Sequence, residues 1–137
     1  MMNNRDNLIS IIVPCYNEEH AIPYFYKAIT EHSTLMKNEF GVDFEYLFIN
    51  DGSVDNTLTV LKEYANKDNR VKYISFSRNF GKESAMYAGL KNASGNYIAI
   101  MDADLQDPPY LLTEMYKTII ESDYAVSYTH LTLPTIA

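Results

Sequence analysis

Four short apolar runs divide the chain, and each leads into polar residues and then into a segment with helical spacing. The runs occupy residues 8–13, 44–49, 71–76 and 98–101. The first is nearly continuous, which is typical of a strand buried on both faces of a parallel sheet. Apolar residues recur at helical spacing between and after the runs, at 21–36, 57–65, 85–92 and beyond Pro109. This alternation predicts an α/β fold, with a Rossmann-like parallel sheet flanked by helices.

Two carboxylates follow the fourth apolar run, Asp102 and Asp104. Side chains two residues apart on a strand point to the same side, so these two can converge at its carboxyl end. Paired carboxylates repel each other unless a cation lies between them, and an oxygen ligand set suits Mg²⁺ or Mn²⁺ rather than zinc. Alone, the pair is equally consistent with two solvated turn residues. Its place at the exit of a buried strand favours the metal site, because open α/β sheets bind ligands there.

Polar residues follow all four predicted strands, and the carboxyl ends of parallel strands share one edge of the sheet. The four clusters are Tyr16/Asn17/Glu18, Asp51/Ser53/Asp55, Arg78/Asn79/Gly81/Lys82 and Asp102/Asp104/Gln106. Any one of them is ordinary turn chemistry. Four clusters on one edge, with a carboxylate pair among them, indicate a ligand site.

Residue type suggests a role for each candidate, beside a plainer structural one. Asp51 can accept hydrogen bonds from a nucleobase or a ribose, or can simply form an Asp-Gly turn. Tyr16 can pack on a base or on the core, and Glu18 can contact a nucleoside or favour a helix N-terminus. Lys82 lies beside a glycine at a helix start, where phosphates bind, but a solvated lysine is commoner. Gln106 offers an amide oxygen to a metal or to its own loop.

Composition narrows the class of protein. The chain has 137 residues, of which 47% are hydrophobic, which suits one domain with a core. A net charge of -7 argues against a nucleic-acid surface and fits a protein that reaches phosphates through a metal. The single cysteine, Cys15, indicates a reducing compartment and is expected in the core. No apolar run reaches membrane-spanning length and the N-terminus is not a signal peptide, so the chain as given is expected to be cytoplasmic.

Four ordered motifs carry a specific resemblance. They lie at residues 9–19, 50–57, 77–82 and 102–109, and the last reads Asp-Ala-Asp-Leu-Gln-Asp-Pro-Pro. Together they resemble the family 2 inverting glycosyltransferases of GT-A fold. The long form of the last motif is similar to the branch that charges polyprenyl phosphates, which includes bactoprenol glucosyltransferases and dolichyl-phosphate mannose synthases.

The resemblance implies a role for each matching residue. Four residues would hold the nucleoside: Pro14, Tyr16, Glu18 and Asp51. Asp102 would lie near the ribose and the metal, while Asp104 and Gln106 would bind the Mg²⁺ or Mn²⁺ that bridges the diphosphate. The implied reaction moves a sugar from a nucleotide-sugar, UDP rather than GDP, to a polyprenyl phosphate with inversion. Residues that contact the acceptor lie beyond Ala125 in the resembling proteins, so no catalytic base is assigned.

The end of the chain is expected to differ from the rest. Val126 to Thr135 resembles the translated read-through of a sequencing-library adapter, so we expect a non-native tail at 126–137. Residues 1–125 would then be the nucleotide-binding part of an incomplete catalytic domain. The resemblance implies that the full-length protein carries C-terminal membrane helices and works at the cytoplasmic face of the plasma membrane.

Other functions stay open from sequence. The chain could bind nucleotide and metal without turnover, or belong to a family 2 enzyme with a saccharide acceptor. A dinucleotide-binding Rossmann domain requires Gly-x-Gly-x-x-Gly after the first strand, and that turn contains no glycine. A phosphoryl-transfer domain with an aspartate nucleophile would not explain Tyr16 and Asp51 together.

Overall fold

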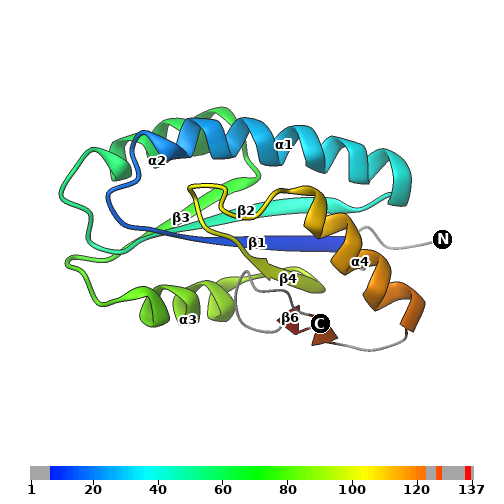
Figure 1. Cartoon of the computed structure of the whole chain (residues 1–137). Coiled ribbons are helices and arrows are strands. Elements are labelled where there is room, and N and C mark those ends of the chain that lie inside the picture. Colours follow the sequence, from blue (N-terminus) through cyan, green and yellow to red (C-terminus); the bar gives the residue numbers. More distant parts are fainter. Residues whose placement is uncertain (1–6, 123–125, 128–134, 137) are drawn as a thin grey trace.

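The computed structural model describes residues 7–122, 126–127 and 135–136, and its main body is a sheet with helices on both faces (Figure 1). Four strands lie side by side in the order β3-β2-β1-β4. They are β1 (Leu8–Cys15), β2 (Asp43–Asn50), β3 (Val71–Ser75) and β4 (Tyr97–Ile100). All three pairings are parallel, which confirms the predicted fold class and brings the four carboxyl ends to one edge.

Four helices cover the sheet, namely α1 (Ala21–Phe40), α2 (Thr57–Lys67), α3 (Lys82–Asn92) and α4 (Tyr110–Ser122). Residues of α1, α2 and α4 share one buried cluster, whereas α3 packs in a second cluster on the opposite face. In Figure 1 α1 and α2 lie above the sheet and α3 lies below it. The sheet is therefore sandwiched, and its carboxyl edge opens between the two helical layers.

Alternation along β1 explains why this strand is central. Ile9, Ile11 and Val13 face the α1 cluster, and Ile12 between them faces the α3 cluster. All four are 3% exposed or less. Burying one such side chain contributes about 1.5–3 kcal/mol, so the nearly continuous apolar run of β1 joins both cores.

Several element boundaries differ from the sequence-based expectations by one to four residues. The expected loop at 38–43 is shorter, because α1 continues to Phe40 and ends at Gly41, whose φ is 74° and whose N–H donates to the Lys37 carbonyl. A left-handed residue after the last turn is a common helix end that glycine adopts at little cost. Similarly, α3 begins at Lys82 rather than at 85, and β1 runs two residues further than predicted, to Cys15.

A buried polar network fixes the start of β4. Ser10 donates to Glu45 over 2.5 Å, and the backbone N–H of Ser94 donates to the same carboxylate over 2.6 Å. Lys72 forms an ion pair with Glu45 at 2.9 Å, and Gly95 N–H donates to Ser10. Burial alone would raise the pKa of Glu45, but these donors outweigh it and the pKa is lowered. The network anchors the segment that enters β4, and β4 carries the chain to Asp102.

Most of residues 126–137 lies outside the described part. Two short strands there, β5 (Val126–Ser127) and β6 (Thr135–Ile136), pair antiparallel with each other in a separate sheet. That this segment is non-native stays a prediction. Among the described residues no helix combines the length and apolar character needed to cross a membrane.

Candidate active site

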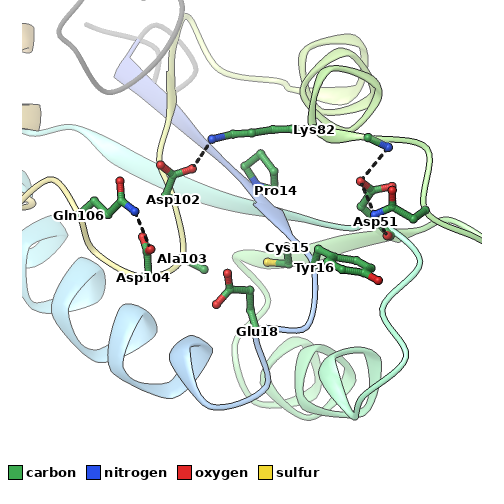
Figure 2. Close-up of a pocket in the computed structure, with 12 residues that line it drawn as sticks. Pro14, Cys15, Tyr16, Glu18, Asp51, Lys82, Asp102, Ala103, Asp104 and Gln106 are labelled. Atoms are coloured by element: carbon green, nitrogen blue, oxygen red, sulfur yellow. Dashed lines mark hydrogen bonds and ion pairs between the residues drawn. The ribbon is translucent and has the colours of Figure 1, made fainter.

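A pocket of about 430 Å³ opens at the carboxyl edge of the sheet. Figure 2 shows how side chains from the ends of β1, β2 and β4 and from the start of α3 surround it. Twelve residues line it: Pro14, Cys15, Tyr16, Glu18, Asp51, Asn79, Gly81, Lys82, Asp102, Ala103, Asp104 and Gln106. All eight residues with a predicted ligand role are among them. The other members of the four polar clusters that do not line the pocket are Asn17, Ser53, Asp55 and Arg78. The structure thus brings together groups that lie up to 92 positions apart, from Pro14 to Gln106.

The turn after β1 is tied to the turn after β2. The N–H of Asn17 donates to Ser53 Oγ, and the N–H of Glu18 donates to Thr57 Oγ1, each over 2.9 Å. Asn17 has a φ of 55°, and its side-chain oxygen accepts from Val54 N–H. Next to this fixed turn, Tyr16 is 47% exposed, so its ring is available to a ligand rather than packed in the core.

Asp51 is buried and already holds the segment before α3. Its carboxylate accepts from Phe80 N–H at 2.7 Å, from Gly81 N–H at 3.0 Å and from Asn79 Nδ2 at 3.3 Å. A carboxylate has about four acceptor positions, so these donors leave one for a ligand. The plain Asp-Gly turn and the ligand contact are therefore compatible roles for Asp51.

Gly52 allows the same segment to approach. With a φ of 66°, it lies so close to Arg78 and Asn79 that an added Cβ would be 2.0 Å from the Arg78 carbonyl carbon and 2.2 Å from the Asn79 nitrogen. No side chain fits there. Hence the turn after β2 sets the position of residues 78–81, and through them the start of α3.

Lys82 crosses the pocket from the first position of α3. Its Nζ lies 2.7 Å from Asp102 Oδ1, and Figure 2 shows the side chain reaching toward that carboxylate. Among the described residues that line the pocket, Lys82 is the one with a positive charge. Lys82 is therefore both exposed, at 53% of its side chain, and paired with an acid of the site.

The acidic side of the pocket follows β4. Asp102 and Asp104 lie beyond the end of the strand at Ile100, in a turn where Leu105 has a φ of 56°. Their proximity therefore comes from this turn and not from strand alternation, which corrects the geometric reason given above. Gln106 Nε2 donates to Asp104 Oδ2 over 2.9 Å. Asp104 is exposed, whereas Asp102 is partly buried beside Lys82.

Negative charge dominates the pocket. Four carboxylates line it, those of Glu18, Asp51, Asp102 and Asp104, against the single ammonium of Lys82. The pKa of Glu18 is raised, first by partial burial and then by the charges of Asp104, Asp102 and Asp55. Neighbouring negative charge thus adds to the effect of burial on the pKa of the Glu18 carboxyl group.

The donor set fits a hard divalent cation, since carboxylate oxygens and the Gln106 amide oxygen are the ligands that Mg²⁺ and Mn²⁺ prefer. Within the described ranges, no three acidic, histidine or cysteine side chains are gathered closely enough to hold a metal ion. Asp102 and Asp104 instead contact Lys82 and Gln106. A metal would be held by Asp104, Gln106 and Asp102 once these side chains had turned from their present partners.

The remaining reactive groups do not form a second catalytic set. Cys15 is buried, as expected, and burial raises the pKa of its thiol, so it lacks nucleophilic character. His32 bonds to Thr113 Oγ1 at 2.8 Å, and His20 is exposed. His130 lies outside the described residues.

Sequence reasoning assigned no role to three pocket residues, Asn79, Gly81 and Ala103. Asn79 belonged to a noted polar cluster, yet its amide donates to Asp51 rather than to a ligand. Gly81 has a φ of 105° and precedes α3. Gly81 beside Lys82 was a visible signal, but nothing in the sequence indicates that Asp51 bonds to this backbone across 30 positions.

The comparison with protein families agrees with the pocket. The family described as "Glycosyl transferase family 2" matches residues 10–133. The chain belongs to glycosyl transferase family 2. It is 49% identical over 113 residues to the putative glycosyltransferase CsbB of Bacillus subtilis, covering 82% of this chain and 33% of that protein. It is also 49% identical over 100 residues to the bactoprenol glucosyl transferase of Shigella phage SfV, covering 73% and 31%.

Solved structures place this family 2 chain among GT-A glycosyltransferases. The S. aureus TarS 1-349 structure in complex with UDP-GlcNAc matches with a TM-score of 0.65 and 29% identity, covering 86% of this chain and 32% of that one. This confirms the predicted GT-A fold. The family 2 chain spans about a third of the length of the relatives it matches.

Proposed function

We propose that this chain is the donor-binding part of a metal-dependent inverting glycosyltransferase. Its donor is a UDP-hexose such as UDP-glucose, and its acceptor is a polyprenyl phosphate. The observation that carries the proposal is the convergence of Tyr16, Asp51 and the Asp102/Asp104 turn on one pocket. The exposed ring and the buried carboxylate with a free acceptor position suit a nucleoside, and the acidic turn suits a diphosphate once a cation is bound between them.

Each part of the pocket has a task in this proposal. Tyr16 packs against the uracil, and the remaining acceptor position of Asp51 takes a base N–H. Asp104, Gln106 and Asp102 would hold a divalent cation, which when bound would offset the negative charge of the diphosphate leaving group. Pro14 and Glu18 complete the nucleoside side of the pocket. Lys82 supplies the positive charge of this chain nearest to the diphosphate.

The inverting step needs little from this chain beyond that positioning. The acceptor attacks the anomeric carbon on the face opposite to the diphosphate, and the C–O bond to the diphosphate breaks as the new bond forms. A lipid phosphate is already anionic and needs no strong general base. We therefore assign no base among the described residues.

Relatives support the choice of donor and acceptor. TarS was solved with UDP and with UDP-GlcNAc at 29% identity, which favours uridine over guanosine. The relatives named bactoprenol glucosyl transferase favour a polyprenyl phosphate acceptor. Such an acceptor is embedded in lipid, so the complete transferase would act at the cytoplasmic face of the membrane.

Calorimetric titration tests the donor site. We expect UDP to bind in the presence of Mn²⁺ more tightly than GDP, and we expect both Mn²⁺ omission and Asp104→Asn to weaken UDP binding at least tenfold. Glu63→Gln is the matched control, because Glu63 is an exposed acid of α2 away from the pocket. Absence of UDP binding by a folded chain, or equal binding by Asp104→Asn, would contradict the proposal.

The acceptor is tested separately with radiolabelled UDP-glucose in the complete transferase that contains this chain. We expect label to move to undecaprenyl phosphate. Transfer to a saccharide and not to the lipid would keep the donor site and overturn the acceptor.

A further inference from the structure

The ion pair between Lys82 and Asp102 occupies a carboxylate that the proposed metal would need. Nζ lies 2.7 Å from Asp102 Oδ1, with the Lys82 side chain 53% exposed and the Asp102 side chain 23% exposed. Asp104 differs, because it accepts a hydrogen bond from the neutral amide of Gln106. The two acids of the turn therefore carry different counter-groups, one charged and one neutral.

The backbone of Lys82 is held in place independently of this ion pair. The two residues before it donate their N–H groups to buried Asp51, and Gly52 leaves no room for the segment to shift inward. Lys82 is then the first residue of α3. With its backbone fixed and its side chain half-exposed, Lys82 can change partner by side-chain rotation without moving the fold.

A divalent cation at Asp102 and an ammonium on the same carboxylate would be two like charges within about 4–6 Å, which disfavours both together. We propose that the Lys82 ammonium competes with the metal for the Asp102 carboxylate, an inference that rests on the proposed function. It lowers the affinity of the pocket for free metal, and the diphosphate relieves the competition by giving the ammonium another anion to bind. Metal and donor are thereby coupled through one side chain.

Electron paramagnetic resonance of Mn²⁺ tests this competition on the chain without nucleotide. We expect Lys82→Gln to bind Mn²⁺ roughly three- to tenfold more tightly than the unsubstituted chain, the range expected for loss of one partly exposed ion pair and its repulsion. Lys91→Gln is the matched control, because it removes one exposed lysine from the last turn of the same helix. It should change the affinity less than twofold.

A second titration adds UDP. In the presence of UDP, the tighter Mn²⁺ binding of Lys82→Gln should disappear, because this variant lacks the ammonium that would bind the diphosphate. The Lys82→Gln variant should then bind UDP with Mn²⁺ more weakly than the Lys91→Gln variant does. Thermal unfolding of all variants verifies that the fold is unchanged.

The outcomes separate this inference from the proposed function. If the unsubstituted chain binds UDP with Mn²⁺ but Lys82→Gln binds free Mn²⁺ no more tightly than Lys91→Gln does, the competition is wrong and the donor site stands. If no variant binds Mn²⁺ with or without UDP, the inference and the metal part of the proposed function both fail. Tighter Mn²⁺ binding by Lys82→Gln alone supports the competition.

Discussion

The two walls of the pocket are held by different kinds of bond. One wall, which we name the β2 wall, consists of Asp51, Gly52 and residues 79–81. There a buried carboxylate accepts backbone N–H groups, and the glycine lies against the opposing backbone. The other, the β4 wall, consists of Asp102, Asp104 and Gln106. Its side chains are held by the ion pair of Asp102 with Lys82 and by the hydrogen bond from the Gln106 amide to Asp104.

The difference indicates which part of a ligand each wall is suited to. Backbone hydrogen bonds to a buried acid fix geometry in advance, and a rigid wall suits the flat, invariant shape of a nucleobase. Exposed acids with exchangeable partners suit a cation that enters and leaves with each diphosphate. We therefore expect substitutions in the β2 wall to change stability as well as binding, and substitutions in the β4 wall to change binding alone.

The largest effect is expected at Gly52. Gly52→Ala adds a Cβ 2.0 Å from the Arg78 carbonyl carbon at a φ of 66°, so backbone must move. We expect a loss of roughly 3 kcal/mol in the free energy of unfolding, measured by urea titration. Gly41→Ala is the control, because its φ is 74° but nothing lies within 4 Å of its Cβ. It should cost about 1 kcal/mol, and equal losses at the two sites would show that the β2 wall is not tightly packed.

A smaller effect is expected when one acid in each wall is replaced by its amide. Asp51→Asn keeps the shape but replaces a charged acceptor of two N–H groups, and should lower the free energy of unfolding by about 1–3 kcal/mol. Asp104→Asn, at an exposed site, should change it by less than about 0.5 kcal/mol. Chemical denaturation of both variants measures the two free energies of unfolding. A loss in Asp104→Asn as large as that in Asp51→Asn would contradict the difference between the two walls.

The smallest effect concerns Glu18. Its pKa is raised in the folded chain, so the ionised group costs stability above that pKa, and the cost fades as the pH falls toward the unfolded value. Glu18→Gln should therefore stabilise the metal-free chain at pH 7 by about 0.5 kcal/mol or less, allowing for solvent screening. The gain should vanish near pH 4.5 and shrink in an Asp104→Asn background. Urea titration at several pH values, with a chelator present, measures the stabilisation of Glu18→Gln. A stabilisation that increased at low pH would contradict this account of Glu18.

The fold could be predicted from the sequence because the apolar residues of the central strand face both sides of the sheet. Residues 8–13 alternate between two cores, and such a run has few solutions other than a central parallel strand. The resulting topology placed all four polar clusters on one edge, so the site residues followed from the fold. Motif resemblance then supplied the roles that residue type alone left open.

The contacts between loops that lie far apart in the chain could not be predicted from the sequence. Residue type allows Asn17 to cap a helix. Instead, α1 begins after His20, and the Asn17 side chain accepts a hydrogen bond from Val54 N–H. The partners of Asp51 lie about 30 positions away and are backbone groups, which residue identity does not reveal. Residue type also does not reveal that Lys82 pairs with Asp102, because a lysine could pair with either acid of the turn.

The most direct test compares uridine with UDP, each with and without Mg²⁺, by nuclear magnetic resonance titration of the chain. Uridine lacks the diphosphate, whereas UDP brings a diphosphate to the proposed metal ligands of the β4 wall. We predict that Mg²⁺ tightens UDP binding at least tenfold, about 1.4 kcal/mol, and changes uridine binding less than twofold. If Mg²⁺ strengthened both ligands equally, or left UDP unchanged, the division of the pocket into a fixed nucleoside wall and a metal-dependent diphosphate wall would be wrong.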